Sequence, residues 1–91
     1  MRIFIDVPDY DGNGIDVLWE KGANYKLEVD ENEVLLTANK LGLIAFAKQM
    51  LYMAYNDLPH GSHVHYDSFF TKINNLNFEL IIAQENDHKT R

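Results

Sequence analysis

The sequence predicts an α+β fold: one two-layer domain in which a mostly antiparallel sheet of about five to six strands packs one face on one main helix. Three observations predict it. Short segments of alternating apolar and polar residues are separated by turns rich in Gly, Asn and Asp. Residues 40–56 carry apolar side chains at helical spacing. The connections between the strands are shorter than the dozen or so residues that a parallel crossover needs.

Four strands are predicted before the helix. Residues 2–7 alternate, with Ile3, Ile5 and Val7 on one face, and stop at Pro8. Residues 15–20, 25–29 and 33–38 follow, each after a turn of Gly, Asn or acidic residues. Two further strands, at residues 63–67 and 78–83, are predicted after the helix. The domain is expected to span residues 1–84, and residues 85–91 read as a frayed polar tail.

The helix is expected to start after Asn39, a good N-cap. Its predicted inward stripe is Leu43, Phe46, Ala47, Met50, Leu51 and Ala54. Because the opposite face is also apolar, both sides of the helix should be covered. The second cover is either another protomer, in a homodimer formed through the helix, or the chain's own Phe69-Phe70 loop.

Composition and charge narrow the classes of function. Residues 1–33 hold nine acids and three bases, and the remainder holds five of each, so the net charge of −6 lies in the first third. Such a surface repels nucleic acid and anionic membranes, whereas it attracts a basic protein; it also simply favours solubility. The N-terminus reaches Asp6 too soon for a signal peptide, and the stretch Leu41–Tyr55 is interrupted by Lys48. A cytoplasmic protein without a membrane partner is expected.

One candidate site is the segment from His60 to Asp67. On a strand, His63, His65 and Asp67 share a face, with His60 nearby, while Val64 and Tyr66 point to the helix. Two imidazoles and a carboxylate can bind Zn²⁺ or Fe²⁺, but a catalytic metal also needs a pocket. The alternative, which we prefer, is a partner-facing strand whose histidines make binding pH-sensitive. No cofactor is expected.

A second candidate is the acidic segment that contains Asp9, Asp11, Asp16 and Glu20. Its spacing matches a calcium-binding loop that Glu20 would close. However, strands are predicted where such a loop needs helices, and Asp16 stands where it needs an aliphatic residue. Asp, Gly and Asn are equally typical of a hairpin turn. We interpret the segment as an acidic, partner-facing turn.

Catalysis has little chemistry to draw on. The chain has no cysteine, its only serines are Ser62 and Ser68, and no glycine-rich phosphate loop follows a strand. Trp19, the single tryptophan, is either a hot spot for a partner or, as we prefer, a residue of the core or of a sheet face. The sequence therefore favours a binding protein over an enzyme.

The chain resembles the immunity protein 32 family of bacterial polymorphic toxin systems. The resemblance covers roughly residues 33–83: a Gly42-Leu43 helix start, the G-x-H-x-H-x-D strand from Gly61 to Asp67, and a final Glu79-Leu80-Ile81-Ile82 strand. The family resemblance implies a small α+β protein that binds and neutralises a cognate toxin domain. Carried over by the motif are Gly61, His63, His65 and Asp67. The acidic first third lies outside it and suits a basic toxin such as a nuclease.

Overall fold

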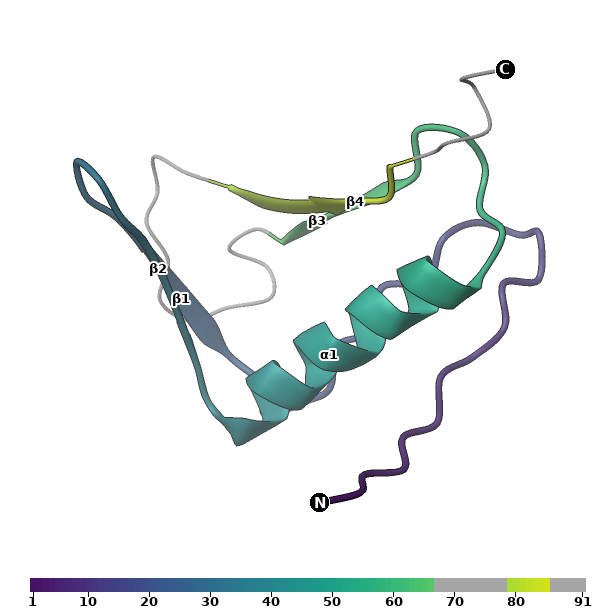
Figure 1. The fold of residues 1–91 in the computed structure, drawn as a ribbon, viewed down its shortest axis with the longest axis horizontal. Coiled ribbons are helices and arrows are strands. Elements are labelled where there is room, and N and C mark those ends of the chain that lie inside the picture. Colours follow the sequence, from purple (N-terminus) through teal and green to yellow (C-terminus); the bar gives the residue numbers. More distant parts are fainter. Residues whose placement is uncertain (67–78, 86–91) are drawn as a thin grey trace.

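The computed structural model describes residues 1–66 and 79–85, which form one helix and four strands. In chain order the elements are β1 (Tyr25–Val29), β2 (Val34–Ala38), α1 (Lys40–Tyr55), β3 (His63–Tyr66) and β4 (Leu80–Ala83). β1 pairs with β2 and β3 pairs with β4, both antiparallel. Figure 1 shows the β3–β4 sheet lying above α1 and the β1–β2 hairpin standing at the N-terminal end of the helix. The α+β class is confirmed.

The prediction of one sheet with five to six strands is wrong for the described residues, which form two separate two-stranded sheets. Residues 2–7 and 15–20 are not strands. Ile3 and Phe4 are 74% and 90% exposed, so the alternation in the first segment has no core to face. The second segment is extended, but its backbone bonds to side chains of α1 rather than to another strand. Alternation predicts an extended chain and cannot specify what bonds to it.

The β1–β2 hairpin follows the prediction closely. Asp30 and Glu33 exchange both backbone hydrogen bonds, at 2.8 and 3.4 Å, so Glu31-Asn32 forms a two-residue loop. The register then pairs Leu27 with Leu36 and Tyr25 with Ala38. Tyr25 and Leu27 are buried on the inner face, which places β1 against the core.

Asn39 is the N-cap of α1, as predicted. Its side-chain oxygen accepts from the Gly42 N–H at 2.8 Å and from the Asn24 N–H at 3.1 Å, and its amide donates to the Gly22 carbonyl at 2.9 Å. One side chain thus joins the helix start to the turn before β1. A Cβ on Gly42 would lie 2.5 Å from the Asn24 carbonyl oxygen, so only glycine allows this close approach.

The predicted inward stripe of the helix is largely wrong. Of its members only Phe46 is buried; Leu43 and Met50 are 56% and 50% exposed. The buried face instead includes Ala45, Phe46, Gln49, Tyr52 and Met53. Gln49 and Tyr52 are buried because their polar groups bond to the N-terminal segment, an arrangement that hydrophobic periodicity cannot indicate.

Four aromatic rings join the elements into one core. The ring of Phe46 on α1 lies 5.0 Å from Trp19 and 5.0 Å from Tyr66 on β3, and Tyr25 on β1 lies 5.5 Å from Phe46. The Tyr25 hydroxyl donates to the Tyr66 carbonyl at 2.7 Å. Such edge-on contacts stabilise beyond simple burial. Trp19 is partly buried and packs against this core.

Asp67, the Phe69-Phe70 loop and most of the predicted polar tail lie beyond the described residues. Within the residues that are described, no helix has the length and apolar character needed to cross a membrane.

Candidate partner-binding site

Residues 8–20, which we call the N-terminal strap, run along α1 and are held by two polar side chains of the helix and by its C-cap residue Asn56. Gln49, Tyr52 and Asn56 lie three and four residues apart, and therefore on one face. Asn56 accepts from the Tyr10 N–H at 2.9 Å, and Tyr52 accepts from the Asp16 N–H at 3.1 Å. Gln49 accepts from the Leu18 N–H at 2.7 Å and donates to the Asp16 carbonyl at 3.0 Å. These bonds fix the strap backbone at residues 10, 16 and 18, while Ile15, Leu18 and Trp19 pack against the core.

The acidic side chains of the strap do face outward. Asp9, Asp11, Asp16 and Glu20 are all exposed. Glu20 forms an ion pair with Lys48 at 3.6 Å. Asp11 accepts from the Asn13 N–H at 2.9 Å, which closes the turn around Gly12 and Gly14, both of which have positive φ. Among the described residues no cation lies within ion-pair distance of Asp9, Asp11 or Asp16, so these three carboxylates are open to an external cation.

The calcium-loop interpretation of this segment finds no support in its shape. A calcium loop wraps its ligands around one centre. The strap instead extends along α1, with anchors from Tyr10 to Leu18. Throughout residues 1–66 and 79–85, no three His, Asp or Glu side chains gather in a way that could hold a metal ion.

A pocket of about 280 Å³ lies between the strap and the helix. Its lining comprises Asp6, Pro8, Val17, Leu18, Trp19, Glu20, Ala45 and Lys48. Carboxylates stand at an apolar and aromatic wall here, a combination suited to the stem and charged head of a basic side chain. Asp6 and Lys48 were not expected at a site from the sequence, because only the fold brings residue 6 beside residue 48.

The histidine strand has the orientation that the sequence predicts. On β3, His63 and His65 are exposed, while Val64 and Tyr66 are buried toward the helix. The two imidazole rings lie 4.9 Å apart. Nδ1 of His65 lies 3.0 Å from a Glu79 carboxylate oxygen, and Nδ1 of His63 lies 2.8 Å from the Gly61 carbonyl oxygen. His60 is also exposed.

These contacts bear on the metal alternative. One ring nitrogen of each strand histidine already faces an oxygen of the protein itself. His60 joins neither of them in a metal-binding group of three, as far as the described residues show. Asp67, the fourth member of the predicted set, lies outside the description.

The acidic strap and the histidine face are two separate surfaces. The strap bonds to the Gln49, Tyr52 and Asn56 side of α1, whereas His63 and His65 lie on the outer face of the β3–β4 sheet. In Figure 1 the N-terminal segment emerges below and to the right of α1, and β3 and β4 lie above the helix. A partner therefore meets these surfaces from different directions.

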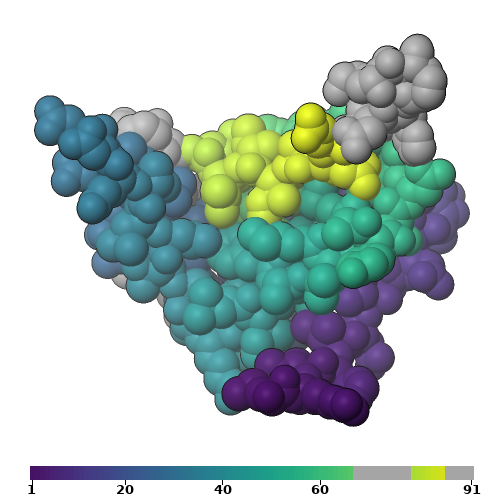
Figure 2. Space-filling view, viewed as in Figure 1, coloured from purple at the N-terminus to yellow at the C-terminus, as the bar shows by residue number. Residues whose placement is uncertain are grey.

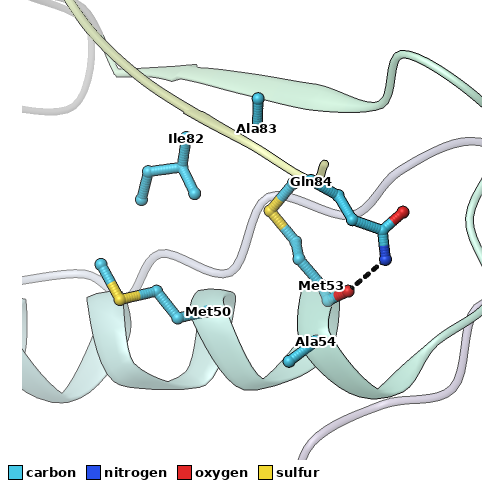
Figure 3. A pocket seen from close by; sticks show the side chains of 6 residues that line it. All are labelled: Met50, Met53, Ala54, Ile82, Ala83 and Gln84. Carbon is cyan, nitrogen blue, oxygen red and sulfur yellow. Dashed lines mark hydrogen bonds between the residues drawn. The ribbon is translucent and has the colours of Figure 1, made fainter. Parts of the chain in front are cut away.

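A second pocket, of about 230 Å³, lies between α1 and β4. Figure 3 shows Met50 and Met53 extending from the helix toward β4, where Ile82 points toward the helix, and the Gln84 amide donates to the Met53 carbonyl at 2.6 Å. The lining is apolar apart from one amide. It offers van der Waals contact but no acid, base or nucleophile.

The surroundings of Tyr66 shift the pKa of its side chain. Burial raises the pKa of its phenol above the usual range, and the neighbouring Tyr25 phenol adds to the rise. A raised pKa keeps the group neutral at physiological pH. This residue therefore belongs to the core and not to an acid-base site.

A family model described as Immunity protein 32 matches residues 33–85, more than half of the 91-residue chain. The chain belongs to the immunity protein 32 family. The resemblance seen in the sequence is thus confirmed. No curated protein and no solved structure matches this family member. The match spans β2, α1, β3 and β4, while the strap and β1 precede it.

Proposed function

We propose that this chain is an immunity protein that binds a cognate toxin domain and blocks the toxin's site with the acidic strap. Membership in the immunity protein 32 family carries the proposal. The protein acts by forming a complex and not by catalysis, in the cytoplasm of the cell that it protects.

The charge distribution supports a basic toxin, such as a nuclease. All nine acids of residues 1–33 are exposed. Asp9, Asp11 and Asp16 are open to cations of a partner, whereas Glu20 is held by Lys48. A concentrated negative surface accelerates the encounter with a positive site and aligns it. A toxin that binds nucleic acid has such a positive site, and the strap would occupy it in place of the phosphates.

The pocket under the strap gives the complex a point of anchorage. A Lys or Arg side chain of the toxin would lay its stem on Trp19 and place its charge between Asp6 and Glu20, displacing Lys48. Charged side chains that become desolvated at an interface centre contribute much of the binding free energy. His63 and His65 form a second contact surface for a toxin large enough to reach the β3–β4 face. The sequence motif adds Asp67, which lies outside the described residues.

A colony-survival assay tests the proposal. The C-terminal domain of the large protein encoded beside this chain in its source bacterium is expressed with and without the chain. We expect the domain to kill and the chain to restore growth. Reversal of Asp9, Asp11 and Asp16 to Lys should abolish rescue, because it turns the attractive surface into a repulsive one.

The matched control reverses Asp30, Glu31 and Glu33 to Lys, which changes the net charge equally but on the β1–β2 loop. This variant should still rescue, and circular dichroism should show both variants folded. If both variants lose rescue equally, the protection depends on the net charge of the chain and not on the position of the acids in the strap. Failure of the unchanged chain to rescue against a toxic domain would overturn the immunity proposal for that pair.

A further inference from the structure

Among the described residues, β2 is an edge strand without the usual protection against pairing. Val34 and Leu35 are 70% and 54% exposed, and Leu36 and Thr37 are exposed as well. The strand reads Val-Leu-Leu-Thr-Ala, with no charge and no proline. Proteins ordinarily guard such edges with lysine, proline, a bulge or a covering element. Figure 2 shows the hairpin projecting at the left of the molecule.

The direction of the free backbone groups follows from the register. Bonded and non-bonded pairs alternate along an antiparallel ladder. Asp30 and Glu33 form a bonded pair, so Val34, Leu36 and Ala38 occupy non-bonded positions toward β1. Their N–H and C=O groups therefore point away from the hairpin. Within the part of the chain that the structure describes, no backbone bond outside the hairpin engages these three residues.

We propose that β2 pairs antiparallel with β2 of a second copy of this chain, about a two-fold axis at Leu36. This arrangement places Leu36 opposite Leu36, Val34 opposite Ala38, and Leu35 opposite Thr37. Every outward N–H then faces a C=O of the other copy. The two hairpins become one four-stranded sheet, the size at which a sheet gains independent stability.

The pairing extends the apolar inner face of the hairpin. Val34 and Leu36 of β2 lie on that face and are 70% and 37% exposed. The same side chains from the second copy would continue the row, so each copy covers apolar surface that the other leaves in water. A two-fold interface needs such a self-complementary surface.

The charges at the two ends of the hairpin favour an antiparallel arrangement of the two copies. Asp30, Glu31 and Glu33 make the loop end of the hairpin acidic. The opposite end carries Lys40 at the helix start and Lys21, whose turn is tied there by the Asn39 bond to Gly22 at 2.9 Å. Antiparallel pairing brings the acidic end of each copy beside the basic end of the other. Parallel pairing would place the acidic ends together.

The chain has no cysteine, so a single introduced thiol reports on this axis without interference. Opposed residues in a bonded antiparallel pair lie about 5.5 Å apart at Cα, within the range that a disulfide spans. We expect Leu36→Cys to give a disulfide-linked dimer under mild oxidation. Val29→Cys is the matched control, since it is equally exposed, on the same face of the same hairpin. It should stay unlinked, because the two β1 strands lie about 14 Å apart in this dimer.

The second measurement is analytical sedimentation of the chain without an introduced cysteine. We expect a dimer that Leu36→Lys weakens by about tenfold or more, because two like charges then meet on the axis, while Val29→Lys leaves it intact. Circular dichroism checks that both variants fold. A monomeric unchanged chain, or equal cross-linking at positions 29 and 36, would overturn the proposal. So would a dimer that cross-links through Leu43→Cys, an exposed residue of α1, and not through position 36.

Discussion

The N-terminal strap and the β1–β2 hairpin are both extended, yet they are held in opposite ways. The hairpin is held by a ladder of backbone bonds between Tyr25–Val29 and Val34–Ala38. The strap has no ladder; Gln49, Tyr52 and Asn56 supply the hydrogen bonds from the helix. A ladder depends on no particular side chain, whereas the backbone hydrogen bonds of the strap come from three specific side chains. The strap is therefore the region that a single substitution can release.

The largest effect should come where the two regions share a core. Phe46 contacts Trp19 at the end of the strap and Tyr25 in β1, at 5.0 and 5.5 Å. Phe46→Ala should lower the free energy of unfolding by about 3–5 kcal/mol, because it leaves a cavity at that junction. Urea unfolding followed by Trp19 fluorescence and by circular dichroism measures it.

The control for that prediction is Tyr55→Ala on the same helix. Tyr55 is 83% exposed, so this change should stay within about 0.5 kcal/mol of the unchanged chain. Coincident transitions by the two probes would show that strap and hairpin unfold together. A fluorescence transition well before the circular dichroism transition would show instead that the core does not couple them.

The next prediction separates the two regions. Gln49→Met keeps the length of the side chain but removes the bonds to the Leu18 N–H and the Asp16 carbonyl. Buried groups left without partners cost about 1–3 kcal/mol. Hydrogen exchange should show the Leu18 amide losing protection while the amides of β1 keep theirs.

Lys48→Met introduces the same side chain one residue earlier and removes only the half-exposed ion pair with Glu20. Its effect should be below about 1 kcal/mol, with Leu18 still protected. If Gln49→Met instead lowers the exchange protection of the strap and hairpin amides equally, the strap does not open independently of the hairpin.

The sequence predicted the hairpin, the helix and the outward histidines, but it did not predict how the strap is held. Hairpin prediction succeeded because the ladder and the alternation of Tyr25, Leu27 and Val29 express the same two-residue period. The prediction for the strap was wrong because Gln49 and Asn56 are polar and were therefore assigned to the surface, whereas in the fold they bind the strap backbone. For the same reason the predicted buried face of α1 was centred on the wrong side of the helix. The open carboxylates of Asp9, Asp11 and Asp16 were expected, while Asp6 beside Lys48 required the fold.

Gly42→Ala tests the hairpin side of the helix without touching the strap. Alanine ordinarily stabilises a helix relative to glycine by about 1 kcal/mol. Here its Cβ would lie 2.5 Å from the Asn24 carbonyl oxygen, at the base of the hairpin. Because that neighbour is backbone, the helix start must move, and we expect a net loss of about 1–2 kcal/mol.

Lys40→Ala, an exposed change in the same turn, should be nearly neutral. Thermal unfolding of the two variants compares them. A Gly42→Ala chain more stable than the unchanged one would mean that the contact between Asn24 and the helix yields easily, contrary to the structure.

The smallest effect concerns alkaline pH and the core that both regions share. Burial, assisted by Tyr25, raises the pKa of Tyr66 in the folded chain above the ordinary value of 10.0. The unfolded chain therefore releases this proton first as the pH rises. The stability from Tyr66 is complete below about pH 10 and declines above it, by at most about 1.4 kcal/mol per pH unit. Urea unfolding at pH 9 to 11 should show this slope, and Tyr66→Phe, which keeps the ring but cannot ionise, should flatten it. If the free energy of unfolding of Tyr66→Phe falls with pH as steeply as that of the unchanged chain, the alkaline loss of stability comes from other tyrosines and not from burial of Tyr66 in the core.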